Sequence, residues 1–296
     1  MQTQQLKRYE TYLRSAKHSS ENTIEAYMRD LRQFSAWLTP RGVKSFAAVT
    51  VPQAKEYVEY LGDCGKSAST VTRTLASLRC FYAYLWSAGK CDSNPFDAIT
   101  PPHAEKKLPM VLTSDEINLL ISQPKPVDFK GYRDRAILEL LYAAGVRVSE
   151  LIALDMSDVN LSAGFIRVGE SGHERVIPIY HEAASAISDY IRCARQKIAI
   201  MPGETALFVN SGGTRMTRQG LWKMLKKYQS QTKIDKEITP QTFRHSLATH
   251  MLQNGADLDT VQEILGHTDK ASTQLYAQML MRGLRDAYDR FHPRAN

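Results

Sequence analysis

The segment TPPHAEKKLPMVL, residues 100–112, is the feature that most limits how this chain can fold. It contains three prolines and a pair of lysines and has no apolar period, so neither a helix nor a strand can continue through it. We therefore predict a linker at residues 100–110, between a first domain at residues 1–99 and a second at residues 111–296. A chain of 296 residues is long enough to give each domain its own core.

The first domain is predicted to be helical. Apolar side chains recur at spacings of three and four over residues 24–38 and again over residues 71–85, as in amphipathic helices that bury one stripe. On the second of these helices we expect Arg73 and Ser77 opposite the apolar stripe, with Arg79 on its flank. A helix with such a face could lie in the major groove of DNA.

The second domain is predicted to be mainly α-helical with one small antiparallel β-sheet. Thr113 and Glu116 form a capping box that starts a helix, and a longer helix should end at Gly145. Residues 155–179 contain three short β-type runs separated by turn residues, which indicates three antiparallel strands. Further helices are expected at residues 181–198, 217–229, 241–254 and 258–265, around Tyr276, and from there to about residue 291.

The charge distribution favours nucleic acid as a partner. The chain carries 38 basic and 31 acidic residues, and no acidic residue lies between Asp63 and Asp92 or between Glu204 and Asp235. Two such basic segments suit binding to a phosphate backbone, because each neutralised phosphate releases counterions. The alternative is a pair of solvated basic helix faces. The side chains expected to contact DNA are those of Arg73, Arg79, Arg218 and Lys223.

Other classes of protein fit less well. No stretch approaches the roughly 20 apolar residues of a membrane span, and we expect a cytoplasmic protein. The four cysteines have no metal-ligand spacing, so neither a metal nor another cofactor is expected. A metal-dependent phosphoesterase is remote, because His245 and His250 are five residues apart and do not share a helical face.

Four residues together could form a site for attack on a phosphodiester. Arg147 lies in AAGVRVSEL with Glu150 three positions on, Arg244 lies in FRHSLATH, and His267 and Tyr276 follow. Taken singly, Arg147 could merely pair with Glu150 at the surface, and Tyr276 could be a buried aromatic. Together, two guanidinium groups, an imidazole and a phenol could hold a phosphate and attack it.

These motifs resemble the catalytic blocks of the tyrosine site-specific recombinases, and the match is close to the Xer branch. It rests on AGVRVSEL, FRHSLATHML, LGH and the later Tyr276, and SENTIEAYMRDLRQFSAWL and LPMVLTSDE extend it over nearly the whole chain. The resemblance implies an N-terminal core-binding (SAM-like) domain and a C-terminal catalytic domain that close as a C-shaped clamp around duplex DNA.

The resemblance also implies the roles of individual residues. Tyr276 would attack the scissile phosphate to give a 3′-phosphotyrosyl link and a free 5′-hydroxyl, with no need for ATP or metal. Arg147 and Arg244 would clamp the phosphate, Glu150 would support Arg147, and His267 would donate a hydrogen bond to the phosphate. Strands would be exchanged in two steps through a Holliday junction, within a tetramer of this chain or of this chain and a related recombinase.

The terminal helix has a predicted role in assembly. Its apolar side would dock on a neighbouring protomer or, alternatively, pack on its own domain. The apolar side consists of Leu280, Leu284, Ala287, Tyr288 and Phe291.

The sequence departs from the family pattern at two positions. Glu170, in the hairpin VGESGHERVIPI, stands where the family has a lysine as general acid, and Gln241 stands where it has a histidine or sometimes a lysine. A carboxylate repels the growing charge of the phosphate, and a glutamine cannot take the proton of a phenol. His173 is the better substitute acid. The expectation is a recombinase with impaired chemistry, through engineering, natural divergence or dependence on an intact partner subunit.

Alternatives remain open at this point. A protein of the same fold could bind DNA, shape it or activate a partner without cleaving. A type IB topoisomerase would use the same nucleophile chemistry, but the Xer-like first half argues against it. Neither the target site nor the biological task, chromosome or plasmid dimer resolution or the integration and excision of an element, can be read from the residues.

Overall fold

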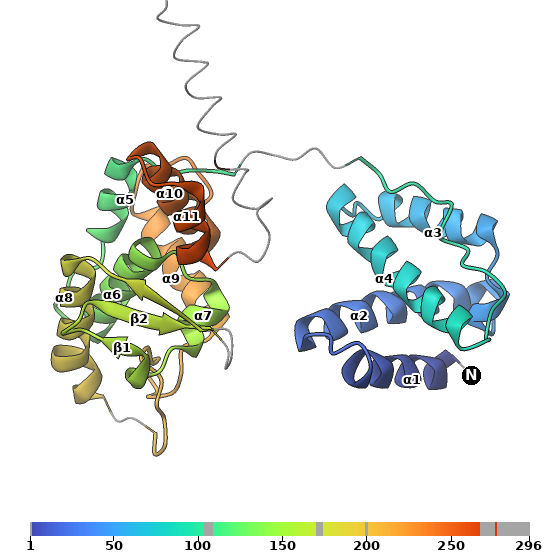
Figure 1. Ribbon diagram of the computed structural model, residues 1–296, viewed down its shortest axis with the longest axis horizontal. Helices are drawn as coiled ribbons and strands as arrows, with labels where there is room; N and C mark the ends of the chain where they lie inside the picture. Colours follow the sequence, from blue (N-terminus) through green and yellow to red (C-terminus); the bar gives the residue numbers. More distant parts are fainter. Residues whose placement is uncertain (1, 104–108, 170–173, 199–200, 267–275, 277–296) are drawn as a thin grey trace, which may run out of the picture. The chain divides into compact units, whose positions relative to one another are not determined.

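The computed structural model describes residues 2–103, 109–169, 174–198, 201–266 and 276 (Figure 1). The chain divides into two compact units, Met1–Lys107 and Leu108–Asn296. The boundary between the units falls within the segment predicted as a linker. The predicted terminal helix, with its apolar side, lies outside the described residues.

The described residues of the first unit form four α-helices and two short 3-10 turns. Helix α2 packs against both α1 and α4, and α3 packs against α4. Both helices predicted from the apolar period are confirmed as α2 and α4, and the Ser20 hydroxyl caps α2 by accepting a hydrogen bond from the Thr23 amide. The helices are α1 Gln2–Ser15, α2 Glu21–Leu38, α3 Val51–Asp63 and α4 Ala68–Ser87, with 3-10 turns at Thr39–Arg41 and Phe46–Ala48.

The prediction that Ser77 lies opposite the buried stripe of α4 is wrong. Its side chain is fully buried and donates a hydrogen bond to Asp30 of α2, 3.2 Å away. Arg73 also pairs with Asp30, through two hydrogen bonds of 2.6 and 2.9 Å. The period of α4 could not reveal this arrangement, because it follows from a buried carboxylate on another helix that needs partners.

In the second unit, helix α6 packs against several other elements. Helix α6 contacts α5, α8, α10 and strand β3. Because other elements cover it on several sides, its buried residues are not confined to one stripe. The helices are α5 Ser114–Ile121, α6 Phe129–Ala144, α7 Val148–Ala153, α8 His181–Asp189, α9 Arg218–Ser230, α10 Pro240–Gln253 and α11 Leu258–Leu265. Helix α8 continues as a π-helical turn, Tyr190–Ala194, and a 3-10 turn, Arg195–Lys197; another 3-10 turn is Met156–Asp158.

A three-stranded antiparallel sheet is confirmed where the sequence predicted it. Its strands are β1 Val159–Asn160, β2 Phe165–Val168 and β3 Arg175–Pro178, in the order β1-β2-β3. Ile166 of β2 lies opposite Ile177 of β3, and both are fully buried. Strand β3 also contacts α11. The sheet therefore connects the core of the unit to α11. This helix ends at Leu265, the first residue of the LGH motif.

Candidate active site

The turn between α6 and α7 depends on a glycine. Gly145 adopts the left-handed conformation, with φ 56°, and ends α6 as predicted. A Cβ atom at this position would lie 2.8 Å from Leu247 Cδ2 and 2.9 Å from Leu265 Cδ2, so a side chain there would have to displace these two leucines. The turn lies against Leu247 of α10 and Leu265 at the end of α11, and it places Arg147 at the N-terminus of α7.

Arg147 and Glu150 pair across the first turn of α7. The Arg147 amide donates to Glu150 Oε2 over 2.7 Å, and Arg147 Nη1 donates to Glu150 Oε1 over 2.8 Å. Arg147 Nη2 donates to the carbonyl oxygen of Gly266 over 3.0 Å. The guanidinium is thus fixed between α7 and the end of α11, and it still reaches solvent, since 44% of the side chain is exposed.

Arg175 of β3 completes this network and was not among the residues predicted from the sequence. Its Nη1 and Nη2 atoms donate to the two carboxylate oxygens of Glu150 over 2.9 and 3.0 Å, and its Nε donates to the carbonyl of Ile264 over 2.9 Å. Burial alone would raise the pKa of Glu150, but hydrogen bonds from Arg175 and the Arg147 amide outweigh it and bring the pKa to about 2. A Cβ atom on Gly266 would lie 2.7 Å from Arg175 Nη1, so this guanidinium packs directly on the residue before His267.

Arg244 lies on α10 and is 2% exposed. Its Nη1 donates to the carbonyl of Gly145 over 2.6 Å, and its Nη2 donates to the carbonyl of Leu265 over 2.5 Å. Burial and then the neighbouring charge of Arg147 lower the pKa of Arg244 to about 10, so it is still a cation at neutral pH. Two guanidinium groups are therefore held close together by backbone carbonyls and one carboxylate.

Tyr276 contacts the same region. Its hydroxyl lies 2.8 Å from His245 Nδ1, and the side chain is 2% exposed. Burial raises the pKa of Tyr276, and the charge of Arg244 partly opposes this rise. Burial and the charge of Arg244 lower the pKa of His245 to about 4, so its imidazole is neutral at pH 7.

The structure thus brings Arg147, Glu150, Arg244 and Tyr276 together and adds Arg175 and His245. Gln241 lies in the first turn of α10 and is exposed. Glu170, His173 and His267 lie outside the described residues, although His267 directly follows Gly266.

The predicted DNA contacts divide into two kinds. Arg218 and Lys223 are exposed on α9, whose N-terminus is capped by the Thr217 hydroxyl. Arg73 instead pairs with buried Asp30, and Arg79 donates to the carbonyls of Phe96 and Ile99 over 3.1 and 2.5 Å. The two arginines of α4 therefore stabilise their own domain, and their contact with DNA stays a prediction.

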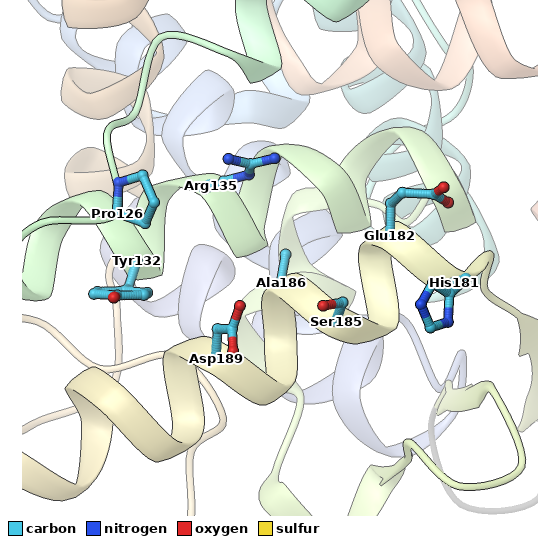
Figure 2. Close-up of a pocket in the computed structure, with 8 residues that line it drawn as sticks. All are labelled: Pro126, Tyr132, Arg135, His181, Glu182, Ser185, Ala186 and Asp189. Carbon is cyan, nitrogen blue, oxygen red and sulfur yellow. The ribbon is translucent and has the colours of Figure 1, made fainter.

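A separate cavity of about 230 Å³ lies between α6 and α8 (Figure 2). Tyr132 and Arg135 line it from α6, and His181, Glu182 and Asp189 line it from α8. None of the residues of the site above takes part, so we do not assign this cavity to the chemistry.

Two features of the described residues bear on other classes of protein. Within the described ranges, no group of three or more His, Cys, Asp or Glu side chains is placed to hold a metal ion. The described helices include none that is long and apolar enough to pass through a membrane.

Comparison with known proteins defines the class. The profile of the phage integrase family matches residues 110–282, and that of the phage integrase N-terminal SAM-like domain matches residues 6–89. The chain belongs to the phage integrase family, the tyrosine recombinases. Within this family it is a Xer-type recombinase, an enzyme that breaks and rejoins DNA.

Relatives and solved structures support this assignment. Tyrosine recombinase XerD of Halalkalibacterium halodurans is 41% identical over 93% of both chains, and that of Staphylococcus epidermidis is 39% identical over 98% of this chain and 99% of its own. XerA recombinase has a similar structure, with 26% identity, a TM-score of 0.55 and coverage of 99% and 100%. XerH bound to palindromic difH substrate has the same fold, with 20% identity, a TM-score of 0.74 and coverage of 96% and 84%.

Proposed function

We propose that this chain carries out site-specific DNA recombination with Tyr276 as the nucleophile and Arg147 and Arg244 as the phosphate clamp. The observation that carries the proposal is that the guanidinium groups of Arg147 and Arg244 are held on two adjacent backbone carbonyls, and their charges act on each other and on Tyr276. The charge of Arg147 lowers the pKa of Arg244, and the charge of Arg244 acts in turn on the phenol of Tyr276. Groups that influence each other in this way can contact a common anion.

The chemistry is a transfer of the phosphate to the tyrosine. The Tyr276 oxygen forms a bond to phosphorus, the bond from phosphorus to the 5′-oxygen breaks, and a 3′-phosphotyrosyl link results. The two guanidinium groups stabilise the charge that builds on the non-bridging oxygens. Attack by a 5′-hydroxyl on the phosphotyrosyl link reverses the step, so the bond energy is kept and no ATP is used.

The remaining parts of the proposal follow the family resemblance. His267 donates a hydrogen bond to the phosphate, the domains at residues 1–99 and 111–296 close around duplex DNA, and strand exchange takes place in a tetramer on two DNA sites. Arg218 and Lys223 near the start of α9 hold phosphates; their exposure supports this, and helix amides at an N-terminus also favour anions. The site of action is the cytoplasm, and the task is dimer resolution or the movement of an element.

We further propose that Glu170 and Gln241 slow this chemistry. Loss of a positioned acid typically lowers a rate by about 10²–10⁴-fold, and Glu170 also brings negative charge to a site built to hold an anion. His173 in the same hairpin supplies a proton in place of the missing lysine. A partner subunit with intact residues at both positions would remove the limitation.

The test uses the full chain and a nicked duplex that traps the covalent product. The duplex carries the site recovered by selection from random DNA, and denaturing gels separate protein–DNA product from free protein. The chain should form product slowly, Glu170→Lys with Gln241→His should form it at least tenfold faster, and Tyr276→Phe should form none. If the unaltered chain is as fast as the double variant, the impairment is wrong. If it binds the site and no variant forms product, the protein is a non-cleaving member of the fold.

A further inference from the structure

The contact between Tyr276 and His245 supplies a group that the sequence pattern lacks. Gln241 occupies the position of the family's histidine, and an amide cannot accept a proton from a phenol. His245 lies on the same helix four residues later, so the two side chains share one side of α10. Its Nδ1 atom lies 2.8 Å from the hydroxyl of Tyr276, within the range for direct proton transfer.

We propose that His245 is a catalytic residue that accepts the proton of Tyr276 during strand cleavage. The proposal rests on the function proposed above. As the Tyr276 oxygen bonds to phosphorus and the bond to the 5′-oxygen breaks, the phenol proton moves to His245 Nδ1, and the 5′-oxygen takes a proton from an acidic side chain or from water. On religation the 5′-hydroxyl attacks phosphorus and gives its proton back to the conjugate base of that acid, the bond from phosphorus to the Tyr276 oxygen breaks, and the imidazolium protonates the leaving phenolate.

The surroundings of the pair keep the nucleophile inactive without DNA. Burial raises the pKa of Tyr276, whereas burial and Arg244 lower the pKa of His245 to about 4, so the proton stays on the phenol. The phenol then donates to the neutral imidazole. Among the described residues, the charged group that acts on the pair is Arg244 on α10, and Arg147, Glu150 and Arg175 act on Arg244 in turn.

Bound DNA changes this balance. A phosphodiester held by Arg147 and Arg244 brings a negative charge close to both guanidinium groups. That charge offsets the effect of Arg244 on the imidazole and makes His245 a stronger base. Transfer of the phenol proton to His245 takes place as the Tyr276 oxygen bonds to phosphorus, when the phenol becomes most acidic.

The same helix offers a matched control. The Nδ1 atom of His250 also shares a hydrogen bond with a tyrosine hydroxyl, that of Tyr142, over 2.9 Å, and burial also lowers the pKa of His250. It lines a different cavity, with Leu247 and Met251. A variant of His250 thus removes a similar half-buried contact without touching the nucleophile.

The first experiment measures single-turnover cleavage of the trapping duplex, in the unaltered chain and in the Glu170→Lys background. His245→Asn should cleave about 10²–10⁴-fold more slowly, with DNA affinity within twofold of the parent and the same melting temperature. His250→Asn should stay within threefold of the parent. His245→Gln, which keeps more of the size of the side chain, replaces the asparagine variant if that variant melts early.

The shape of the pH profile separates a base from a structural group. The parent rate should level off once the imidazole of the DNA complex is neutral, whereas the His245→Asn rate should keep rising as hydroxide takes over. A variant rate within threefold of the parent, or a slower rate with the parental profile, overturns the assignment while the parent's own cleavage leaves the proposed function standing. A parent that forms no covalent product overturns both.

A duplex with sulfur in place of the 5′-bridging oxygen shows whether His245 acts on the nucleophile or on the leaving group. A thiolate leaves without being protonated, so this substrate should restore cleavage to variants that lack the acid. His245→Asn should remain slow on it, because its defect lies at the nucleophile. Full recovery of His245→Asn with sulfur would place His245 at the leaving group and contradict the proposal.

Discussion

Arg175 and Glu150 are joined by two parallel hydrogen bonds, 2.9 and 3.0 Å long, between a strand and a helix 25 residues apart in sequence. Glu150 is also bound by the amide and the guanidinium of Arg147. The position of the exposed Arg147 guanidinium therefore depends on Arg175, whose own side chain is mostly buried. The Nε, Nη1 and Nη2 atoms of Arg175 all donate hydrogen bonds to protein oxygens. We therefore regard Arg175 as a positioning residue rather than a phosphate ligand.

Arg175→Lys should destabilise the protein and slow cleavage. Lysine keeps the charge but cannot form the two-armed pair with Glu150 or reach Ile264 as well. Both side chains are mostly buried, so we expect a loss of about 2–4 kcal/mol in the free energy of unfolding. Urea denaturation measures it. Arg192→Lys at the exposed pair with Asp189 is the control and should leave the free energy of unfolding nearly unchanged, because exposed ion pairs contribute little. Equal effects at both positions would contradict the argument.

The stabilising effect of Glu150 should be lost in acid. Its pKa falls from about 4.5 in the unfolded chain to about 2 in the fold. A depressed pKa gives stability that is fully present above pH 4.5 and disappears as the pH falls towards 2. The shift corresponds to roughly 3 kcal/mol at neutral pH.

Denaturation of the parent and Glu150→Gln at pH 7, 5 and 3 tests this pH dependence. The stability gap between them should be widest at pH 7 and should shrink by about 2 kcal/mol by pH 3. A gap that stays constant over this range would show that the carboxylate is not held as a charged group.

Gly145→Ala should harm both the fold and the site. The left-handed φ of 56° penalises any side chain, and the new methyl group would press on Leu247 and Leu265. Gly203→Ala separates these effects, because its φ is 81° but no atom lies within 4 Å of the added Cβ. We expect about 1 kcal/mol for Gly203→Ala and about 1–3 kcal/mol more for Gly145→Ala, measured by urea denaturation. Equal losses would mean that the packing around Gly145 adjusts freely.

Lys223 and Arg73, both predicted to contact DNA, should respond differently to replacement by alanine. Lys223→Ala should leave stability unchanged and reduce the slope of log affinity against log salt by about 1, as expected for one lost phosphate contact. Arg73→Ala should instead lower stability by about 1–3 kcal/mol, because it leaves the buried Asp30 carboxylate with only Ser77. Binding titrations at several salt concentrations, with Lys130→Ala as the control for an exposed lysine elsewhere, decide the outcome.

The sequence by itself determined the local elements and the family. The helix at Leu258–Leu265, the capping box of Thr113 and Glu116, the end of α6 at Gly145 and the three strands all occur where the pattern predicted them. Each depends on neighbours within a few residues, through caps, period or turn geometry. The motifs around Arg147, Arg244 and Tyr276 also pointed to the tyrosine recombinases, which the comparisons confirm.

Only the tertiary structure decided which side chains meet. Arg175 pairs with Glu150 across 25 residues, Tyr276 with His245 across 31, and Arg73 with Asp30 across 43. No local period encodes such pairs, because they arise when a buried charge or hydroxyl on one element must find a partner on whichever element packs against it. For that reason Ser77 was placed on the wrong face, and the residues that hold Arg147 and Tyr276 in position became visible only in the fold.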